Sequence, residues 1–170
     1  DALIDHLFEH PNTAPSVAHR FIQRFTTSNP SPRHVKAVAD AFRTGEYPPG
    51  SGSLHPWSSQ RYGDLGATVA ALLLDREARS LVLDADPTHG ALREPVVKLY
   101  HLLRGLEYRS RDHREVALTE GLISKIGQAV YRAPSVFNFF SPEFAAEGPV
   151  QDAGLVAPEA QLGILPNVIG

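Results

Sequence analysis

Proline and helix-capping residues divide the first part of the chain into separate short helices, and this feature restricts the fold most. Pro11 disfavours the α conformation at the residue before it, so a helix ends there. Asn12 or Thr13 is placed to cap a second helix, and Ser31 with Pro32 is typical of the start of a third. The sequence therefore predicts successive short helices in this region and not one long helix.

Apolar residues recur at helical spacing along most of the chain, whereas runs that alternate apolar and polar residues are lacking. We predict an all-α fold, an irregular bundle of about six helices with long Pro/Gly-rich loops. The expected helices cover residues 2–9, 13–28, 32–44, 65–75, 95–106 and 115–128, with a short one after Pro158. The side chains expected inward on the second and fourth of these helices are Val17, Phe21, Ile22, Phe25, Leu65, Val69, Leu72 and Leu73.

The composition is that of a globular protein of one domain, which we expect to cover residues 1–170. The apolar fraction is 42% and the charged fraction is 21%. Basic residues gather only between Lys98 and Arg114, a narrower field than a nucleic-acid-binding protein usually has, so we expect no nucleic-acid partner. No apolar run approaches the roughly 20 residues of a membrane span, so we do not expect a transmembrane protein.

Two segments lack helical periodicity. Residues 45–63 are rich in glycine and proline and include Trp57, the only tryptophan, so we expect a flexible loop that exposes this side chain to a partner protein or a polysaccharide. Residues 133–144 (APSVFNFFSPEF) predict an irregular aromatic segment near the C-terminus, held to the core by its phenylalanines. Asn138 within it is a candidate ligand-binding residue, although core packing alone also explains the aromatic rings.

A metal-binding pattern occurs near the start of the chain. His6, Glu9 and His10 match H-x-x-E-H, in which two histidines bind zinc and the glutamate activates water. Against this interpretation, Pro11 ends the helix at His10, so the two rings need not share one face. A histidine at the end of a helix also has an ordinary role, since it interacts well with the terminal carbonyl groups.

A second group of charged residues surrounds the start of the helix expected at residue 95. Arg93 can bind an anionic ligand, Glu94 lies where a carboxylate interacts well with free amides, and His101 lies at the edge of the same helix. These residues are candidates for ligand binding. The alternative is a structural corner in which the charges cap and bridge helices, and we favour it.

Blocks of the sequence, in order and spacing, resemble the large bacterial domain-of-unknown-function 1800 family. They are HPNTAPSVAHRFIQRFTTSNPSPRHVKAVADAF, GDLGATVAALLLDREAR, REPVVKLYHLLRGL, APSVFNFFSPEF and GLVAPEAQL. The resemblance covers nearly the whole chain but corresponds to the C-terminal part of a typical member, so we expect a fragment of a longer polypeptide. Because members often carry export signals, it also implies an extracytoplasmic parent protein, although this chain contains no such signal. The family brings no catalytic residues with it.

Two hypotheses about function follow. The first, which we favour, is a helical scaffold or binding module of an exported bacterial protein that contacts a partner protein or a surface polysaccharide and needs no cofactor. The alternative is a metal-dependent hydrolase or oxidoreductase that holds a divalent ion through His6 and His10, with Glu9 beside them. In that case, the missing N-terminal region can complete the site.

Overall fold

The computed structural model describes residues 1–50, 52, 56–109, 125–129 and 131–163. Within these residues the chain is helical and forms no strand, and its one β-type contact is an isolated bridge between Ser135 and Asn138. The predicted all-α class is therefore confirmed. The chain divides into two compact units, residues 1–90 and 91–170, so the expectation of one domain over the whole chain stays a prediction. None of the described helices combines the length and the apolar character needed to cross a membrane.

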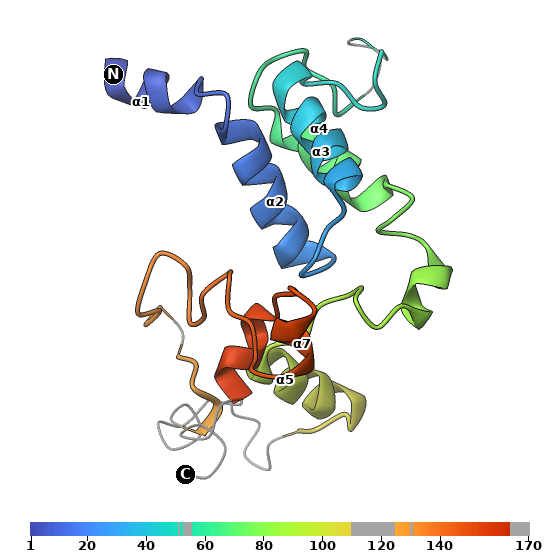
Figure 1. Ribbon diagram of the computed structural model, residues 1–170, viewed down its shortest axis with the longest axis vertical. Coiled ribbons are helices and arrows are strands. Elements are labelled where there is room, and N and C mark those ends of the chain that lie inside the picture. The colour runs from blue at the N-terminus through green and yellow to red at the C-terminus, as the bar shows by residue number, and fades with distance from the viewer. Residues whose placement is uncertain (51, 53–55, 110–124, 130, 164–170) are drawn as a thin grey trace. The chain divides into compact units, whose positions relative to one another are not determined.

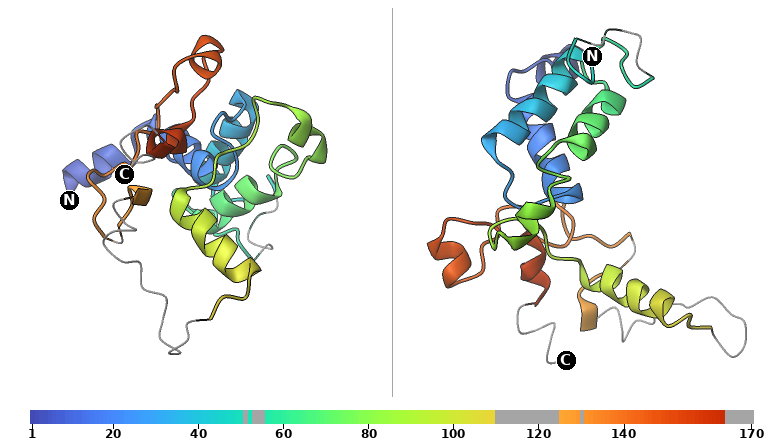
Figure 2. Two further views of the ribbon diagram at one scale, coloured as in Figure 1. Left: turned by 90° about the horizontal axis from the view of Figure 1, so that it is seen from below. Right: turned by 90° about the vertical axis from the view of Figure 1, so that its right-hand side faces the viewer.

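The first unit is built on three helices, each packed against the next (Figure 1). These are α2 (Thr13–Phe25), α3 (Pro32–Thr44) and α4 (Leu65–Leu74). Helix α1 (Ala2–Phe8) precedes them and runs off to one side, and η2 (Leu81–Ala85) follows them. The second view in Figure 2 shows α3 and α4 lying along each other.

The helix boundaries follow the capping residues of the sequence. The Ser31 hydroxyl accepts a hydrogen bond from the His34 N–H at 3.1 Å, and an Asp64 carboxylate oxygen accepts one from the Ala67 N–H at 2.9 Å. Gly45 ends α3 with φ of +65°, in the left-handed region that glycine adopts at little cost. The predicted start and stop of α3 and the predicted start of α4 are confirmed, whereas Asn12 begins α2 without a side-chain cap.

Small side chains make up much of the core between α2, α3 and α4. Alanine lets neighbouring helix backbones approach closely, and the larger side chains Ile22, Phe42 and Leu72 fill the remaining space. The buried cluster comprises Ala14, Ala18, Ile22, Val38, Ala39, Ala41, Phe42, Ala71 and Leu72. Half-buried Val17, Phe21 and Val35 pack against it, as do Tyr47 and Tyr62 from the connection between α3 and α4.

Several predicted core positions are wrong. Phe25 is 57% exposed, since α2 turns its alanines inward, and Leu65, Val69 and Leu73 lie on the exposed side of α4. Nearly every residue of α4 is apolar, so its sequence does not mark one face. The close packing of α4 against α3 buries its small side chains instead. Of the predicted α4 positions, only Leu72 is buried.

The described residues of the loop 45–63 are partly held in place. The buried Ser58 hydroxyl accepts a hydrogen bond from the Tyr47 N–H at 2.9 Å and donates one to the Tyr47 carbonyl at 3.1 Å. Trp57 is 40% exposed, whereas Tyr62 is half-buried and its hydroxyl donates to the Phe8 carbonyl at 2.9 Å. The loop thus closes back on the helices through its two ends.

The second unit contains α5 (Pro95–Gly105), the short α7 (Pro149–Asp152) and the 3-10 helix η3 (Pro158–Gly163), which matches the helix predicted after Pro158. Most of the helix predicted at 115–128 lies outside the described residues. In the aromatic segment Phe139, Phe140 and Phe144 are half-buried. Phe137 is 56% exposed, so the expectation that it anchors the segment is wrong.

Candidate functional site

The start of α3 and the residues after α4 form a charged cluster, which comprises Ser31, Arg33, His34, Asp75 and Glu77. The connection between α3 and α4 reverses the chain, so the first turn of α3 meets the residues that follow α4. The Ser31 N–H donates to a Glu77 carboxylate oxygen at 3.0 Å, and the Ser31 hydroxyl donates to the other oxygen. Glu77 therefore joins the cap of α3 to the segment after α4.

Arg33 binds both carboxylates of the charged cluster. Its guanidinium donates to the two oxygens of Asp75 at 2.9 and 2.5 Å, and to Glu77 at 3.2 Å. The hydrogen bond to Asp75 raises the pKa of Arg33 above its ordinary value. Burial acts to raise the pKa of Asp75 and of Glu77, but hydrogen bonds from Arg33 and Ser31 outweigh it, so both pKa values lie below the ordinary ones. Both carboxylates are thus charged at neutral pH.

His34 has no exposed surface, and neither of its ring nitrogens has a hydrogen-bond partner. Its Nδ1 atom lies 3.6 Å from a Glu77 carboxylate oxygen. His34, Asp75 and Glu77 each offer one nitrogen or oxygen atom, and these three atoms lie within 4.8 Å of one another. In the described part of the chain, this group has the side chains and the spacing to hold a metal ion.

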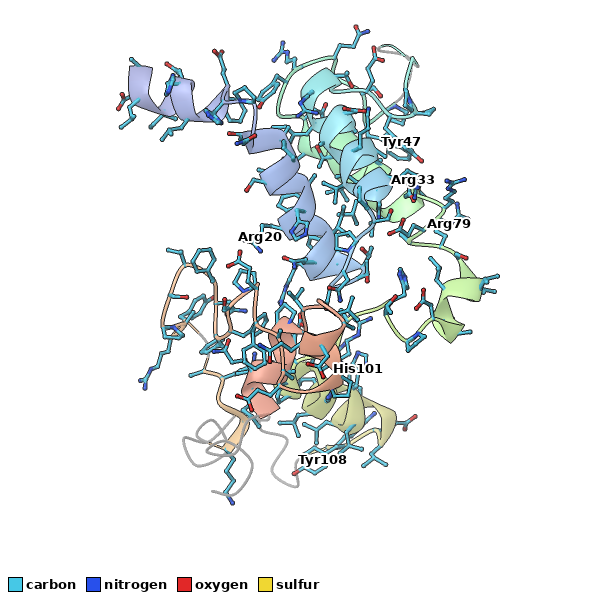
Figure 3. All side chains as sticks on the ribbon, in the orientation of Figure 1. Arg20, Arg33, Tyr47, Arg79, His101 and Tyr108 are labelled. Atoms are coloured by element: carbon cyan, nitrogen blue, oxygen red, sulfur yellow. The ribbon has the colours of Figure 1, made fainter. Side chains whose placement is uncertain are left out.

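A cavity of about 380 Å³ opens beside the charged cluster. Figure 3 shows Arg33 and Tyr47, which both line this cavity. Its lining residues come from α3, from the loop after it and from the end of α4: Arg33, Lys36, Ala37, Asp40, Ala41, Tyr47, Pro49, Ala71 and Asp75. Arg33 and Asp75 belong to both, so the cavity adjoins the charged cluster.

A different surface is formed by α1, whose apolar side chains Leu3, Ile4, Leu7 and Phe8 we call the α1 face. Spacings of three and four residues place them on one side of the helix. They are 65%, 64%, 57% and 44% exposed, and α1 buries no residue. Phe8 fixes the end of α1, because its ring stacks edge-on against Tyr62 at 5.0 Å and Phe42 at 6.1 Å.

The histidines of the predicted metal motif do not share a helix. Helix α1 ends at Phe8, so His6 lies within it and His10 beyond it. The His10 Nδ1 atom accepts a hydrogen bond from the Asn12 N–H at 3.2 Å and is used by the turn. The structure provides no support for a site at these residues, and metal binding by His6 and His10 stays a prediction.

Of the other predicted site residues, four lie in the second unit and Trp57 lies in the first. Glu94 is 8% exposed and accepts a hydrogen bond at 2.7 Å from the amide of the buried Gln128. Arg93 and His101 are exposed, the latter on α5 (Figure 3). Asn138 is half-buried in a turn with φ of +74°. Trp57 belongs to the first unit, where its Cβ lies beside Gly66 of α4. Ligand binding by these five residues stays a prediction.

Sequence reasoning did not find the charged cluster. The sequence predicts Asp75 as the last residue of the fourth helix, Glu77 in a turn or short continuation after it, and His34 within the third helix with no assigned role. One signal in the sequence could have indicated the cluster. When one connection joins two successive antiparallel helices, the start of the first helix lies near the end of the second. Charged residues at both of those ends then indicate an ion-pair cluster.

The family model for a protein of unknown function (DUF1800) matches residues 1–162. The chain belongs to this family. A comparison with curated proteins finds no match, and neither does a comparison with solved structures. Membership in DUF1800 agrees with the resemblance seen in the sequence, and it assigns no activity to the charged cluster, the cavity or the α1 face.

Proposed function

We propose that residues 1–90 of this DUF1800 chain are a helical binding module that docks on a partner protein through the α1 face. The observation that carries the proposal is that α1 buries no residue although four of its seven residues are large and apolar. A surface helix normally turns such a stripe toward its own core. Contiguous exposed apolar surface of this kind marks interaction sites.

The α1 face is pre-organised for binding. The Phe8 ring contacts Phe42 and Tyr62, and the Thr13 hydroxyl donates to the Leu7 carbonyl at 2.6 Å. These contacts hold the end of α1 against the three-helix core while Leu3 and Ile4 stay exposed. A helix that is already folded and anchored loses less conformational entropy on binding than a disordered segment does.

The chemistry of the α1 face favours a protein over a polysaccharide. Leu3, Ile4 and Leu7 are aliphatic and offer no hydrogen bonds, whereas sugar sites use aromatic rings together with polar groups. Burial of a whole aliphatic side chain contributes about 1.5–3 kcal/mol, so the exposed parts of these three contribute roughly 4 kcal/mol together. An apolar groove on a partner protein is the surface that gains this energy.

Photo-crosslinking tests the proposal. A photoreactive residue replaces Ile4 in one variant and Val82, which is 82% exposed on η2, in a control variant. In the cells that make the full polypeptide, we expect position 4 to form a discrete adduct with one other protein, and Leu7→Ser to abolish that adduct. An adduct only within the same polypeptide, or equal labelling from positions 4 and 82, contradicts the proposal.

Affinity measurements with the identified partner complete the test. Leu3→Ser together with Leu7→Ser removes about half of the apolar contact, and we expect binding at least about tenfold weaker, which corresponds to 1.4 kcal/mol. Leu81→Ser together with Val82→Ser removes similar exposed apolar surface from η2 and leaves affinity unchanged. Equal effects from the two pairs contradict docking through the α1 face.

We propose further that the parent polypeptide is exported and that this module works outside the cytoplasm. The basis is the export signals that members of the family often carry. Fractionation of cells that make the full polypeptide tests this, with recovery in the periplasm or the medium as the expected result. Recovery with the cytoplasmic proteins contradicts it.

A further inference from the structure

We propose that His34, Asp75 and Glu77 bind one divalent transition-metal ion of the zinc type. This site is separate from the α1 face and from the His6 and His10 motif. Two independent observations support it. The donor atoms of the three residues lie within 4.8 Å of one another, and the buried imidazole among them has no hydrogen-bond partner on either nitrogen.

The spacing is close to what a zinc-type ion requires. Bonds of about 2.0–2.2 Å at tetrahedral angles place neighbouring ligand atoms roughly 3.4 Å apart. The His34 Nδ1 atom and the Glu77 oxygen are separated by 3.6 Å. The oxygen that Asp75 offers lies within 4.8 Å of the other two donor atoms and has to move closer to them to complete three ligands.

The donor set selects the class of ion. One imidazole nitrogen and two carboxylate oxygens are a combination that zinc and related divalent transition ions accept. Magnesium and calcium prefer sites made of oxygen alone, so the imidazole argues against them. The two carboxylates offset two of the three positive charges that a divalent ion and the Arg33 guanidinium bring together.

An ion accounts for one of the two unpartnered nitrogens of His34, the Nδ1 atom that lies near Glu77. A buried polar group left without a partner costs about 1–3 kcal/mol, and a metal bond supplies that partner. The side chain of Arg33 is 38% exposed, so its charge is partly solvated when an ion shares Asp75 and Glu77. The adjoining cavity of about 380 Å³ is lined by Asp75, which is the ligand on the side from which we expect an ion to enter.

The simpler alternative is that protonated His34 forms an ion pair with Glu77. It predicts no stoichiometric metal binding, and so the two accounts are separable. Isothermal titration of the chelator-treated full chain with zinc chloride is the first experiment. We expect one equivalent to bind, with magnesium at the same concentration giving no heat and no competition. Absence of saturable zinc binding overturns the proposal.

Variants locate the ion. Asp75→Asn keeps the shape of the ligand but removes its charge, and we expect zinc affinity to fall roughly 100-fold, since even changes outside the ligand shell cost 10- to 100-fold. His34→Leu is expected to remove binding. The matched control is His6→Ala with His10→Ala, which leaves affinity unchanged. An unchanged zinc affinity in Asp75→Asn, or a loss of zinc binding in the control, overturns the assignment.

X-ray absorption of the zinc-loaded wild-type chain keeps the test independent of whether His34→Leu folds. The expected first shell holds one imidazole nitrogen, with the remaining ligands oxygen. A first shell with two or more imidazoles indicates surface histidines and overturns the proposal. Far-ultraviolet circular dichroism of Asp75→Asn checks that its weaker binding does not come from loss of the helical fold.

Discussion

Leu72 and Leu73 are neighbours in α4 that the structure places in opposite surroundings. Leu72 has no exposed surface and lies in the cluster between α2, α3 and α4, whereas Leu73 is 48% exposed. The sequence alone predicts both inward. Replacing each in turn by alanine therefore tests which face of α4 is buried, because the chemical change is the same in the two variants.

The burial of the two side chains sets the expected magnitudes. Leu→Ala removes three carbons, which at about 0.8 kcal/mol each gives roughly 2.4 kcal/mol for the buried Leu72. A residual cavity of roughly 40 Å³ adds about 1 kcal/mol at 24 cal/mol per Å³, so the total is about 3.4 kcal/mol. For the half-exposed Leu73 the transfer cost is about half as large, water fills the space, and alanine favours the helix slightly, so we expect about 1 kcal/mol.

Urea unfolding followed by circular dichroism at 222 nm measures the difference. With a slope of about 2 kcal/mol per molar urea, the midpoint falls by about 1.7 M for Leu72→Ala and about 0.5 M for Leu73→Ala. Equal losses of free energy in the two variants, or a larger loss for Leu73→Ala, refute the packing of α4 described above. An unchanged slope in both variants shows that the comparison concerns stability and not a change in the unfolded state.

Three further predictions concern single residues. Gly45→Ala places a Cβ 2.4 Å from the backbone of Arg61 at a φ of +65°, so we expect a loss of unfolding free energy above the 1–2 kcal/mol or so of left-handed strain alone, measured by urea unfolding. Hydrogen bonds from Ser59 lower the pKa of Asp64, so this carboxylate stabilises the fold above its ordinary pKa of 3.8 and loses that effect as the pH falls through the lower folded value. Asp64→Asn, which still caps α4, is therefore expected to be less stable than wild type at pH 7, by a margin that shrinks toward pH 3. Gln128→Leu removes the amide that donates to the buried Glu94 carboxylate and is expected to cost about 1–3 kcal/mol in thermal or urea unfolding.

Each of these predictions has a control. Gly50→Ala meets no atom within 4 Å at a φ of +78°, so it reports the backbone strain without the clash, and an equal loss at positions 45 and 50 shows that the contact with Arg61 is unimportant. A constant difference between wild type and Asp64→Asn from pH 7 to pH 3 contradicts the lowered pKa. Glu94→Gln together with Gln128→Leu removes the buried charge as well as its donor. If Gln128→Leu costs no more than that double variant, the hydrogen bond is not what stabilises the start of α5.

Local signals predicted the helix boundaries well. Ser31, Asp64 and Gly45 act within one turn of their own position, so their effect is visible in the sequence. The faces of the helices were predicted less well. In α2 and α4, alanines and larger apolar residues follow the same helical spacing, so the sequence does not show which of them are buried. The distance to the neighbouring helix decides this: Ala18 and Ala71 face inward, whereas Phe25 and Leu73 do not.

The candidate sites also differ in whether local sequence or tertiary packing reveals them. His6, Glu9 and His10 were visible as a motif because they are adjacent in sequence, and the end of α1 at Phe8 then separated the two histidines. His34 and Glu77 are far apart in sequence and match no known sequence motif. Their approach depends on how α3 packs against α4, a contact that no local spacing encodes.

The sequence by itself determined the helical class, the capped starts and stops and the family, because these depend on local backbone preferences and on the order of blocks along the chain. Only the tertiary structure decided which side chains are buried, that α1 keeps its apolar face exposed, and that an unpartnered imidazole meets two carboxylates. The physical reason is that burial and charge pairing arise between segments distant in the chain. Their energies depend on how closely helices approach, and many sequences with the same local pattern allow different approaches.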